Sequence, residues 1–384
     1  MSWGAKTVEK LREEFVLAAE NCNNFSALCR EFGITRKTGY KWISRASVDE
    51  PLSDRFINRS TAPKNVANKT SAEKEKLILD CRKDNPAWGG KTIRKVLENE
   101  GQDKLPCVKT CNNILKRNNC IDPAESLKHK PYQRFEREKC NELWQTDFKG
   151  DFALLDGSRC YPLTILDDHS RFSILIDAKP DSCGVKDSFK LAFLSYGMPD
   201  SILSDNGSQF AGLRGGYTGF ERWLMDYDIL PIHGRIMHPQ TQGKIERFHR
   251  TMNQELLKHS TFADLADVDM HLQNWRRKYN EIRPHEALGL KAPAQVYVPS
   301  LREYHEKPDK FEFSGLYPVR KVNNHGYLRF GPVQIYLSDT MINTYLEIRP
   351  CNDSDTFIVY YRNFKIAVVD AASRKLVNRK ISRL

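Results

Sequence analysis

The sequence has no long hydrophobic run, and its first residues carry no apolar stretch. No segment of the 384 residues approaches the roughly 18–20 consecutive apolar residues that a membrane span needs, so we expect no integral membrane protein. The opening MSWGAKTVEK lacks the apolar region of a secretory signal, which favours a cytoplasmic protein. A hydrophobic fraction of 40% with 28% charged residues is typical of a globular chain rather than a disordered one.

The ten cysteines lack the spacing of a zinc site. Cys107 and Cys111 lie close together, but no second cysteine pair and no paired histidines accompany them. A chain without a secretory signal keeps its thiols reduced, which argues against a disulfide framework. Because the two residues fall on one face of a predicted helix, we expect both in a hydrophobic core.

Acidic residues are scarce in the first part of the chain. Residues 1–140 hold 28 Lys and Arg against 19 Asp and Glu, a net charge of +9, and the remaining 32 basic and 30 acidic residues add only +2 to the total of +11. A basic front segment indicates contact with a polyanion, most simply nucleic acid. A solvated surface with a mild basic bias is the alternative on charge alone.

Residues 1–48 have the pattern of a helix-turn-helix unit. Apolar side chains at helical spacing predict a helix over 6–20, and a second short helix ends at Gly33, since glycine accepts the left-handed cap conformation. Thr35 is a suitable N-cap for a third helix, although Gly39 within that helix costs roughly 1 kcal/mol. This layout places a third helix in the major groove of DNA, here with the side chains of Arg36, Lys37, Tyr40 and Lys41.

A linker over residues 49–69 precedes a second helix-turn-helix-like domain over 70–121. We expect its helices over 72–83, 88–97 and 108–117. Three helices of this size also serve as a simple packing module, which is the alternative to DNA binding. The basic side chains that we expect to face DNA are Lys91, Arg94, Lys95 and Lys109. A charged connector over 122–140 follows.

Residues 141–300 alternate between short strands and helices, which predicts a mixed α/β domain. The expected strands cover 143–148, 151–155, 160–166, 171–178, 201–204 and 229–233, and the expected helices include one near 189–196, one over 220–226 and one over 240–258. In this arrangement Asp147 lies in the first strand and Asp205 directly follows a later one. Glu246 lies on the edge of the buried face of a helix.

Three carboxylates that converge from separate elements repel one another unless a cation lies between them. Carboxylate oxygens are hard ligands and select Mg²⁺ or Mn²⁺. Two such ions can hold the attacking and leaving oxygens of a phosphodiester displacement. Spacing alone is weak evidence, because 49 acidic residues allow many such triples. For the nearby Asp167 and Asp168 we expect turn or capping roles.

The sequence around each carboxylate provides stronger evidence. The segments LWQTDFKG, LTILDDHSRF, ILSDNGSQF, HPQTQGKIERFHRTMNQEL and YNEIRPHEALGLKAPAQVY resemble the integrase-core DDE transposases of bacterial insertion sequences, which are related to retroviral integrases. The resemblance implies a ribonuclease-H-like catalytic core, with Asp147, Asp205 and Glu246 as the catalytic residues and as ligands of two Mg²⁺ ions, for which Mn²⁺ can substitute. It also implies a bacterial protein associated with the nucleoid.

The chain departs from the resemblance in one respect. Forty residues separate Asp205 from Glu246, several more than in many relatives, and we assign the surplus to a loop insertion in the glycine-rich segment 211–220. Residues around Glu246 are expected to touch DNA, namely His238, Gln242, Lys244 and Arg250. For Arg250 the alternative is an ion pair with Glu246, one helical turn away.

The last segment, residues 301–384, is expected to form a β-rich domain. Alternating apolar residues over 316–370 predict a small antiparallel barrel or sheet. After Asp370 the tail contains five basic residues and no acidic one, which suits phosphate contact or, alternatively, a solubilising end.

Together these features predict a DNA transposase. We expect it to bind the terminal inverted repeats of its element, to nick DNA with Mg²⁺ and expose a 3′-hydroxyl, and to join that end to target DNA. Bridging two ends implies a homo-oligomer, at least a dimer. One alternative is a non-catalytic DNA-binding regulator. The other is a ribonuclease H-type nuclease, but a nuclease of this type would give the basic front segment no role.

Overall fold

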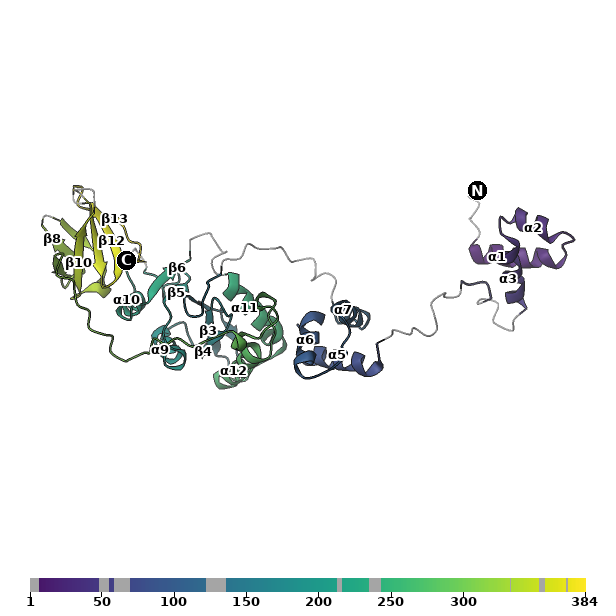
Figure 1. Ribbon diagram of the computed structural model, residues 1–384, viewed down its shortest axis with the longest axis horizontal. Coiled ribbons are helices and arrows are strands. Elements are labelled where there is room, and N and C mark those ends of the chain that lie inside the picture. Colours follow the sequence, from purple (N-terminus) through teal and green to yellow (C-terminus); the bar gives the residue numbers. More distant parts are fainter. Residues whose placement is uncertain are drawn as a thin grey trace. The chain divides into compact units, whose positions relative to one another are not determined.

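The computed structural model describes residues 7–47, 55–58, 70–121, 136–212, 216–234, 243–331, 333–351, 356–370 and 372–384. The chain divides into two compact units, Met1–Lys69 and Thr70–Leu384, which are considered separately (Figure 1). Within the described residues, no helix combines the length and the apolar character that crossing a bilayer requires.

The first unit contains the expected helices, α1 (Val8–Glu20), α2 (Phe25–Glu31) and α3 (Arg36–Ala46). Gly33 has a φ of +65° after α2, and the Thr35 hydroxyl accepts a hydrogen bond from Thr38 N at 3.2 Å. Packing explains why a glycine, which lowers helix propensity, occurs at position 39. A Cβ at this position would lie 2.9 Å from atoms of Phe15, Phe25 and Cys29, so only glycine lets the helices approach this closely.

The second unit begins with α5 (Ala72–Asp84), α6 (Gly90–Asn99) and α7 (Val108–Arg117). Helix α6 starts two residues later than predicted, because Gly89 is its extended N-cap and Trp88 is buried in the core between these helices. Cys111 is buried in that core as expected, but the expectation for Cys107 is wrong. Cys107 is the N-cap of α7 and is exposed, since it precedes the helical face that points inward.

The central sheet is mixed, as predicted. Its strands are β1 (Trp144–Phe148), β2 (Phe152–Ala153), β3 (Arg159–Asp167), β4 (Ser173–Lys179), β5 (Ser201–Ser204) and β6 (Leu230–His233). Strand β3 pairs antiparallel with β1, β2 and β4, whereas β1, β5 and β6 run parallel to one another. The parallel strands therefore end at the same edge of the sheet.

Helices cover both faces of this sheet. On one face, α9 (Val185–Tyr196) and α10 (Gly219–Asp226) pack their aromatic side chains against Trp144 and Ile165. On the other, α11 (Gly243–Glu255) and α12 (Leu265–Glu281) pack against Leu166 and Ile176. Each large apolar side chain buried in this way contributes about 1.5–3 kcal/mol of transfer free energy. Helix α11 ends three residues before the predicted 258 and gives way to a 3₁₀ turn over Leu257–His259.

The C-terminal region is β-rich, as expected, and all of its strand pairs are antiparallel. One sheet has the strand order β13-β12-β11-β10-β7, with β14 on β12, and β8 and β9 form a separate hairpin (Figure 1). The strands are β7 (Val319–Lys321), β8 (Tyr327–Phe330), β9 (Val333–Tyr336), β10 (Tyr345–Pro350), β11 (Thr356–Tyr361), β12 (Phe364–Asp370), β13 (Lys375–Asn378) and β14 (Ser382–Arg383).

Part of the surplus segment after Asp205 joins the central α/β region to this β-rich region. Tyr217 is buried in the hydrophobic cluster of the C-terminal sheet, and its hydroxyl donates to the carbonyl of Ile366. Its backbone N donates to Ser338 Oγ at 3.1 Å, and that hydroxyl donates to Tyr217 O at 2.9 Å. The insertion therefore supplies an anchoring side chain as well as extra loop length.

We expect Tyr217→Ala to loosen this contact. Truncating a buried aromatic ring costs about 3–5 kcal/mol, so amide hydrogen exchange in α10 and β12 should become at least about a hundredfold faster. Tyr345, on β10 of the same sheet, is 55% exposed, so Tyr345→Ala serves as a control with an expected change within about 0.5 kcal/mol. Equal exchange rates in the two variants would show that Tyr217 does not fasten these regions.

Candidate functional site

Asp147 and Asp205 lie side by side at the shared edge of two parallel strands. The register pairs Trp144 with Ile202 and Gln145 with Leu203, so continuing it by two residues brings Asp147, in β1, beside Asp205, which directly follows the end of β5 at Ser204. Neighbouring strands are about 4.8 Å apart, and residues two apart point to the same face. Both carboxylates therefore share the face of the sheet that Gln145 occupies, which is the face covered by α11.

Glu246 reaches this edge from the first turn of α11. Ile245 and Phe248 are buried and hold the helix against the sheet, whereas Glu246 is exposed beside them. The backbone N of Ile245 donates to Gln145 Oε1 on β1 at 3.3 Å. This bond satisfies a first-turn N–H that has no partner within the helix, and it fixes the start of α11 relative to the strand that carries Asp147.

The pKa of Asp147 reflects the proximity of the other two carboxylates. Burial, followed by the negative charges of Asp205 and Glu246, raises the pKa of Asp147 from 3.8 to about 7, against a smaller opposing effect of Lys149. A cation between these groups would relieve that repulsion. Within the described residues, no cluster of three or more His, Cys, Asp or Glu side chains is close enough to hold a metal ion. The aspartate pair thus supplies the oxygen donors suited to Mg²⁺, and Glu246 lies across from it.

His249 and Thr164 support Asp147 from within the protein. The Thr164 hydroxyl donates to Asp147 O at 2.9 Å, so His249 Nε2, 2.7 Å from that hydroxyl, must be the donor to it. Burial, together with the charge of Lys149, lowers the pKa of His249 to about 3. The imidazole is therefore neutral at pH 7, and its Nδ1 lies 3.8 Å from Asp147 Oδ2 without neutralising it.

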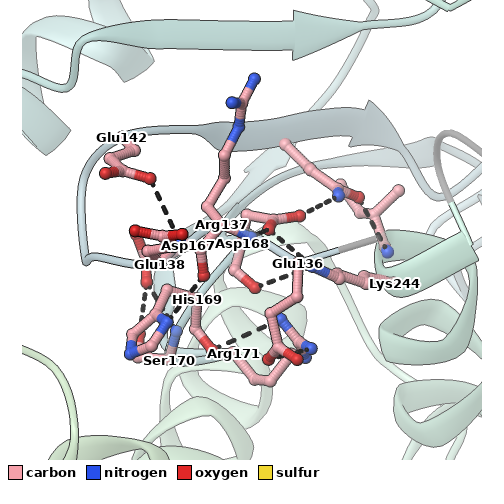
Figure 2. Close-up of polar contacts among 12 residues, drawn as sticks. Glu136, Arg137, Glu138, Glu142, Asp167, Asp168, His169, Ser170, Arg171 and Lys244 are labelled. Atoms are coloured by element: carbon pink, nitrogen blue, oxygen red, sulfur yellow. Dashed lines mark hydrogen bonds and ion pairs between the residues drawn. The ribbon is translucent and has the colours of Figure 1, made fainter. Parts of the chain in front are cut away.

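Asp168 and Lys244 form a buried ion pair behind the site, and Figure 2 shows the two side chains pointing toward each other. Asp168 is fully buried, and its Oδ2 lies 2.5 Å from Lys244 Nζ. The other oxygen, Oδ1, accepts a hydrogen bond from Gln145 Nε2 at 2.7 Å. Sequence reasoning missed this network, because its three members lie far apart in the chain. The available signal was that Gln145 and Lys244 each precede a predicted site carboxylate by two residues.

Asp167 has the turn and capping role that the sequence predicted. Its Oδ2 accepts hydrogen bonds from Ser170 N at 2.8 Å and Ser170 Oγ at 2.6 Å, and its Oδ1 accepts one from Asn141 N at 2.8 Å. Asp167 therefore closes the turn after β3. The prediction for Asp168 was incomplete, because this carboxylate also makes a contact with α11.

The predicted DNA-contacting residues fall into distinct environments. On α3, the side chains of Arg36, Lys37, Tyr40 and Lys41 are all exposed. Lys109 is exposed as well, whereas Arg94 and Lys95 approach Glu98 at 3.9 and 3.3 Å and Lys91 approaches Glu286 at 3.4 Å. Around Glu246, Arg250 is exposed and Lys244 is turned inward. His238 and Gln242 lie outside the described residues.

The raised pKa of Asp147 predicts a pH dependence of stability for the metal-free protein. The folded state binds a proton at Asp147 more tightly than the unfolded chain does, so the free energy of unfolding should fall as pH rises from about 4 to about 7. Asp147→Asn should flatten this fall in urea titrations at a series of pH values. In the control Asp156→Asn, the lost carboxylate has a pKa lowered by Ser158 and titrates below about pH 4, so the slope between pH 4 and 7 should stay as in the unaltered protein. An unchanged slope for Asp147→Asn would contradict the placement.

Two family models and a solved structure are similar to parts of this chain. A family model described as an integrase core domain matches residues 137–239, and a second model of the same description matches residues 227–293. The catalytic core domain of HTLV-2 integrase, solved in complex with magnesium, is 18% identical, with a TM-score of 0.32, and the match covers 41% of this chain and 97% of that one.

Curated relatives come from mobile elements. An uncharacterized protein of insertion element IS476 from Xanthomonas euvesicatoria is 31% identical over 160 residues, which cover 40% of this chain and 44% of the relative. The transposase of transposon Tn552 from Staphylococcus aureus is 28% identical over 168 residues, covering 37% of this chain and 33% of the relative. The chain thus spans less than half the length of either protein. Residues 137–293 thus match models of the integrase core domain, and over this part the chain is similar to proteins of bacterial insertion elements.

Proposed function

We propose that this protein is a DNA transposase that acts through Asp147, Asp205 and Glu246. The observation that carries the proposal is the β1–β5 register, which aligns the two aspartates, together with the first turn of α11, which brings Glu246 to the same edge. The proposed reaction nicks DNA by hydrolysis to free a 3′-hydroxyl end and then joins that end to target DNA by strand transfer. The integrase core domain and the transposase relative support this class of reaction.

The three carboxylates fit a pair of Mg²⁺ ions, for which Mn²⁺ would substitute. When bound, these ions would supply the charge stabilisation that a phosphodiester displacement needs. The protein would supply the ligands from three elements, because β1 carries Asp147, Asp205 follows β5 and the first turn of α11 carries Glu246. His249 is neutral and supports Asp147 through Thr164 without competing for its negative charge. The nucleophile comes from water or from the DNA end, so no side chain of this site has to form a covalent bond.

DNA recognition is assigned to the front of the chain. The sequence divides it into a helix-turn-helix over 1–48, a linker over 49–69, a second such domain over 70–121 and a connector over 122–140. We propose that α3 enters the major groove of the terminal inverted repeats, since its exposed face carries basic and aromatic side chains. The core over 141–300 would then cut and join, and the domain over 301–384, with its basic tail, would add contacts to DNA. Joining two ends requires a homo-oligomer, at least a dimer.

The catalytic assignment is tested with Glu246→Gln. We expect nicking and joining of labelled inverted-repeat DNA in Mg²⁺ to fall by at least about a hundredfold, since the change removes a charge from the metal-binding set. The matched control is Glu281→Gln, which makes the same substitution at an exposed position of α12 and should retain full activity.

The outcomes separate the candidate functions. If Glu246→Gln nicks and joins as well as the unaltered protein, the assignment of Glu246 fails. If the unaltered protein binds the repeat DNA but never nicks it, a DNA-binding regulator becomes the better description. Cleavage restricted to RNA–DNA hybrids would favour a ribonuclease H-type nuclease instead.

The DNA-binding assignment predicts a change in salt dependence. Replacing both Arg36 and Lys37 with glutamine should reduce the magnitude of the slope of log affinity against log salt concentration by about 2. Each phosphate contact displaces about one counterion from DNA on binding, so the loss of two contacts removes about two released counterions. Fluorescence anisotropy on a repeat duplex measures this between about 50 and 200 mM salt. Lys190→Gln, on the exposed side of α9, is the control and should leave the slope unchanged. A slope that stays constant in the double variant would remove α3 from the interface.

A further inference from the structure

We propose that Asp168 and Lys244 are positioning residues that set the place of Glu246 relative to Asp147. This inference rests on the proposed function, because it gives the pair a role in building the same carboxylate site. The pair, labelled in Figure 2, links the two elements that carry these carboxylates. Lys244 belongs to α11, and Asp168 contacts β1 through Gln145.

The contacts of Asp168 use both of its oxygens. Oδ2 accepts from Lys244 Nζ at 2.5 Å and from the backbone N of Arg137 at 2.9 Å, whereas Oδ1 accepts from Gln145 Nε2 at 2.7 Å. Lys244 Nζ also donates to the backbone carbonyl of Asp168 at 3.1 Å. The backbone N of Asp168 donates to Leu143 O at 2.9 Å, at the start of β1. Asp168 is therefore fixed to β1 by its backbone and to α11 by its side chain.

The spacing along each element connects this network to the site. Gln145 precedes Asp147 by two residues on β1, so both side chains lie on the same face of the strand. Lys244 precedes Glu246 by two residues in the first turn of α11. Gln145 completes the connection, because its Oε1 accepts from the backbone N of Ile245. A shift of α11 along the sheet would break these contacts and would move Glu246 away from Asp147.

Stability alone is a weak explanation for such a pair. Burying two charges costs desolvation energy that their attraction often only offsets, and apolar replacements of similar volume are frequently tolerated. Asp168 is fully buried, and the side chain of Lys244 is only 15% exposed. The pair instead determines how α11 lies against β1, because a charge-assisted contact holds two groups within a narrow range of distance and angle.

The pair also determines the net charge of the site. A lysine two residues before Glu246 could act as a counterion of the carboxylates and compete with a metal ion. Asp168 instead holds the ammonium group of Lys244 beside Gln145, so the negative charge of Asp147, Asp205 and Glu246 stays available. Positioning and charge separation thus follow from the same contact.

The test compares Asp168→Asn with Asp167→Asn in the full-length protein. Both aspartates are fully buried, and both variants lose one charge of a hydrogen-bonded carboxylate, but only Asp168 contacts α11. The measurements are the concentration of MgCl₂ or MnCl₂ that gives half of the maximal thermal shift, and the concentration that gives half-maximal nicking. For Asp168→Asn we expect both concentrations to rise by about tenfold or more, as for other residues that orient metal ligands. For Asp167→Asn we expect the unaltered values.

A second variant keeps the test decisive if Asp168→Asn folds poorly. The double substitution Asp168→Asn with Lys244→Met removes both charges, so no unpaired charge remains buried and thermal stability should recover. We expect its response to MgCl₂ to stay weakened, because α11 has lost its charged contact. Recovery of both properties would reduce the pair to a structural role and overturn the inference.

The remaining outcomes separate this inference from the proposed function. If Asp168→Asn and Asp167→Asn respond to MgCl₂ like the unaltered protein, the inference fails while the transposase assignment stands. If the unaltered protein shows a metal-dependent thermal shift but no nicking, the proposed function fails, and the shift still tests the positioning. The absence of any metal response in the unaltered protein overturns both.

Discussion

The parallel pairing of β1 with β5 is the constraint on which the site depends. It brings Asp147 beside Asp205 with both side chains on one face of the sheet, so their repulsion is set by the backbone and not by a choice of rotamer. Trp144 and Ile202, which pair in this register, are both buried in the cluster under α9 and α10. Moving the register by one residue would turn this apolar set toward α11. The hydrophobic core thus maintains an electrostatic arrangement that is unfavourable in isolation.

Much of the fold could be predicted from periodicity, and the failures have identifiable physical causes. The strands of the central sheet and the helix carrying Glu246 follow from local apolar patterns. Lys244 was predicted to touch DNA because, in sequence, it is one of several polar residues beside Glu246, the predicted catalytic glutamate. Its real partner, Asp168, is 76 residues away, and no local pattern reports that contact. Cys107 was misplaced although the start of its helix was predicted correctly, because Cys107 is the N-cap and the buried face that contains Cys111 does not extend to it.

The presence of Gly39 and the packing of the inserted segment after Asp205 also depend on tertiary contacts. Gly39 lowers helix propensity, and the reason for its presence is the space that Phe15, Phe25 and Cys29 occupy around α3. The surplus residues after Asp205 read as a loop in sequence, but Tyr217 within them is buried against the C-terminal sheet. The sequence predicted where the extra chain lies, whereas its packing partner comes from strands more than a hundred residues later.

His249 and Lys244, two basic groups near the carboxylates, are prevented from neutralising them in different ways. Burial and the charge of Lys149 keep His249 neutral, and Asp168 holds the ammonium group of Lys244. Lys149 lowers the pKa of Asp147, but its effect is smaller than the increase caused by burial and the neighbouring carboxylates. The protein's own basic side chains therefore compensate little of the repulsion among the three carboxylates. A cation from solution would be attracted by this uncompensated negative charge. The divalent-ion site that we propose needs this deficit of positive charge, which results from where the basic side chains are held.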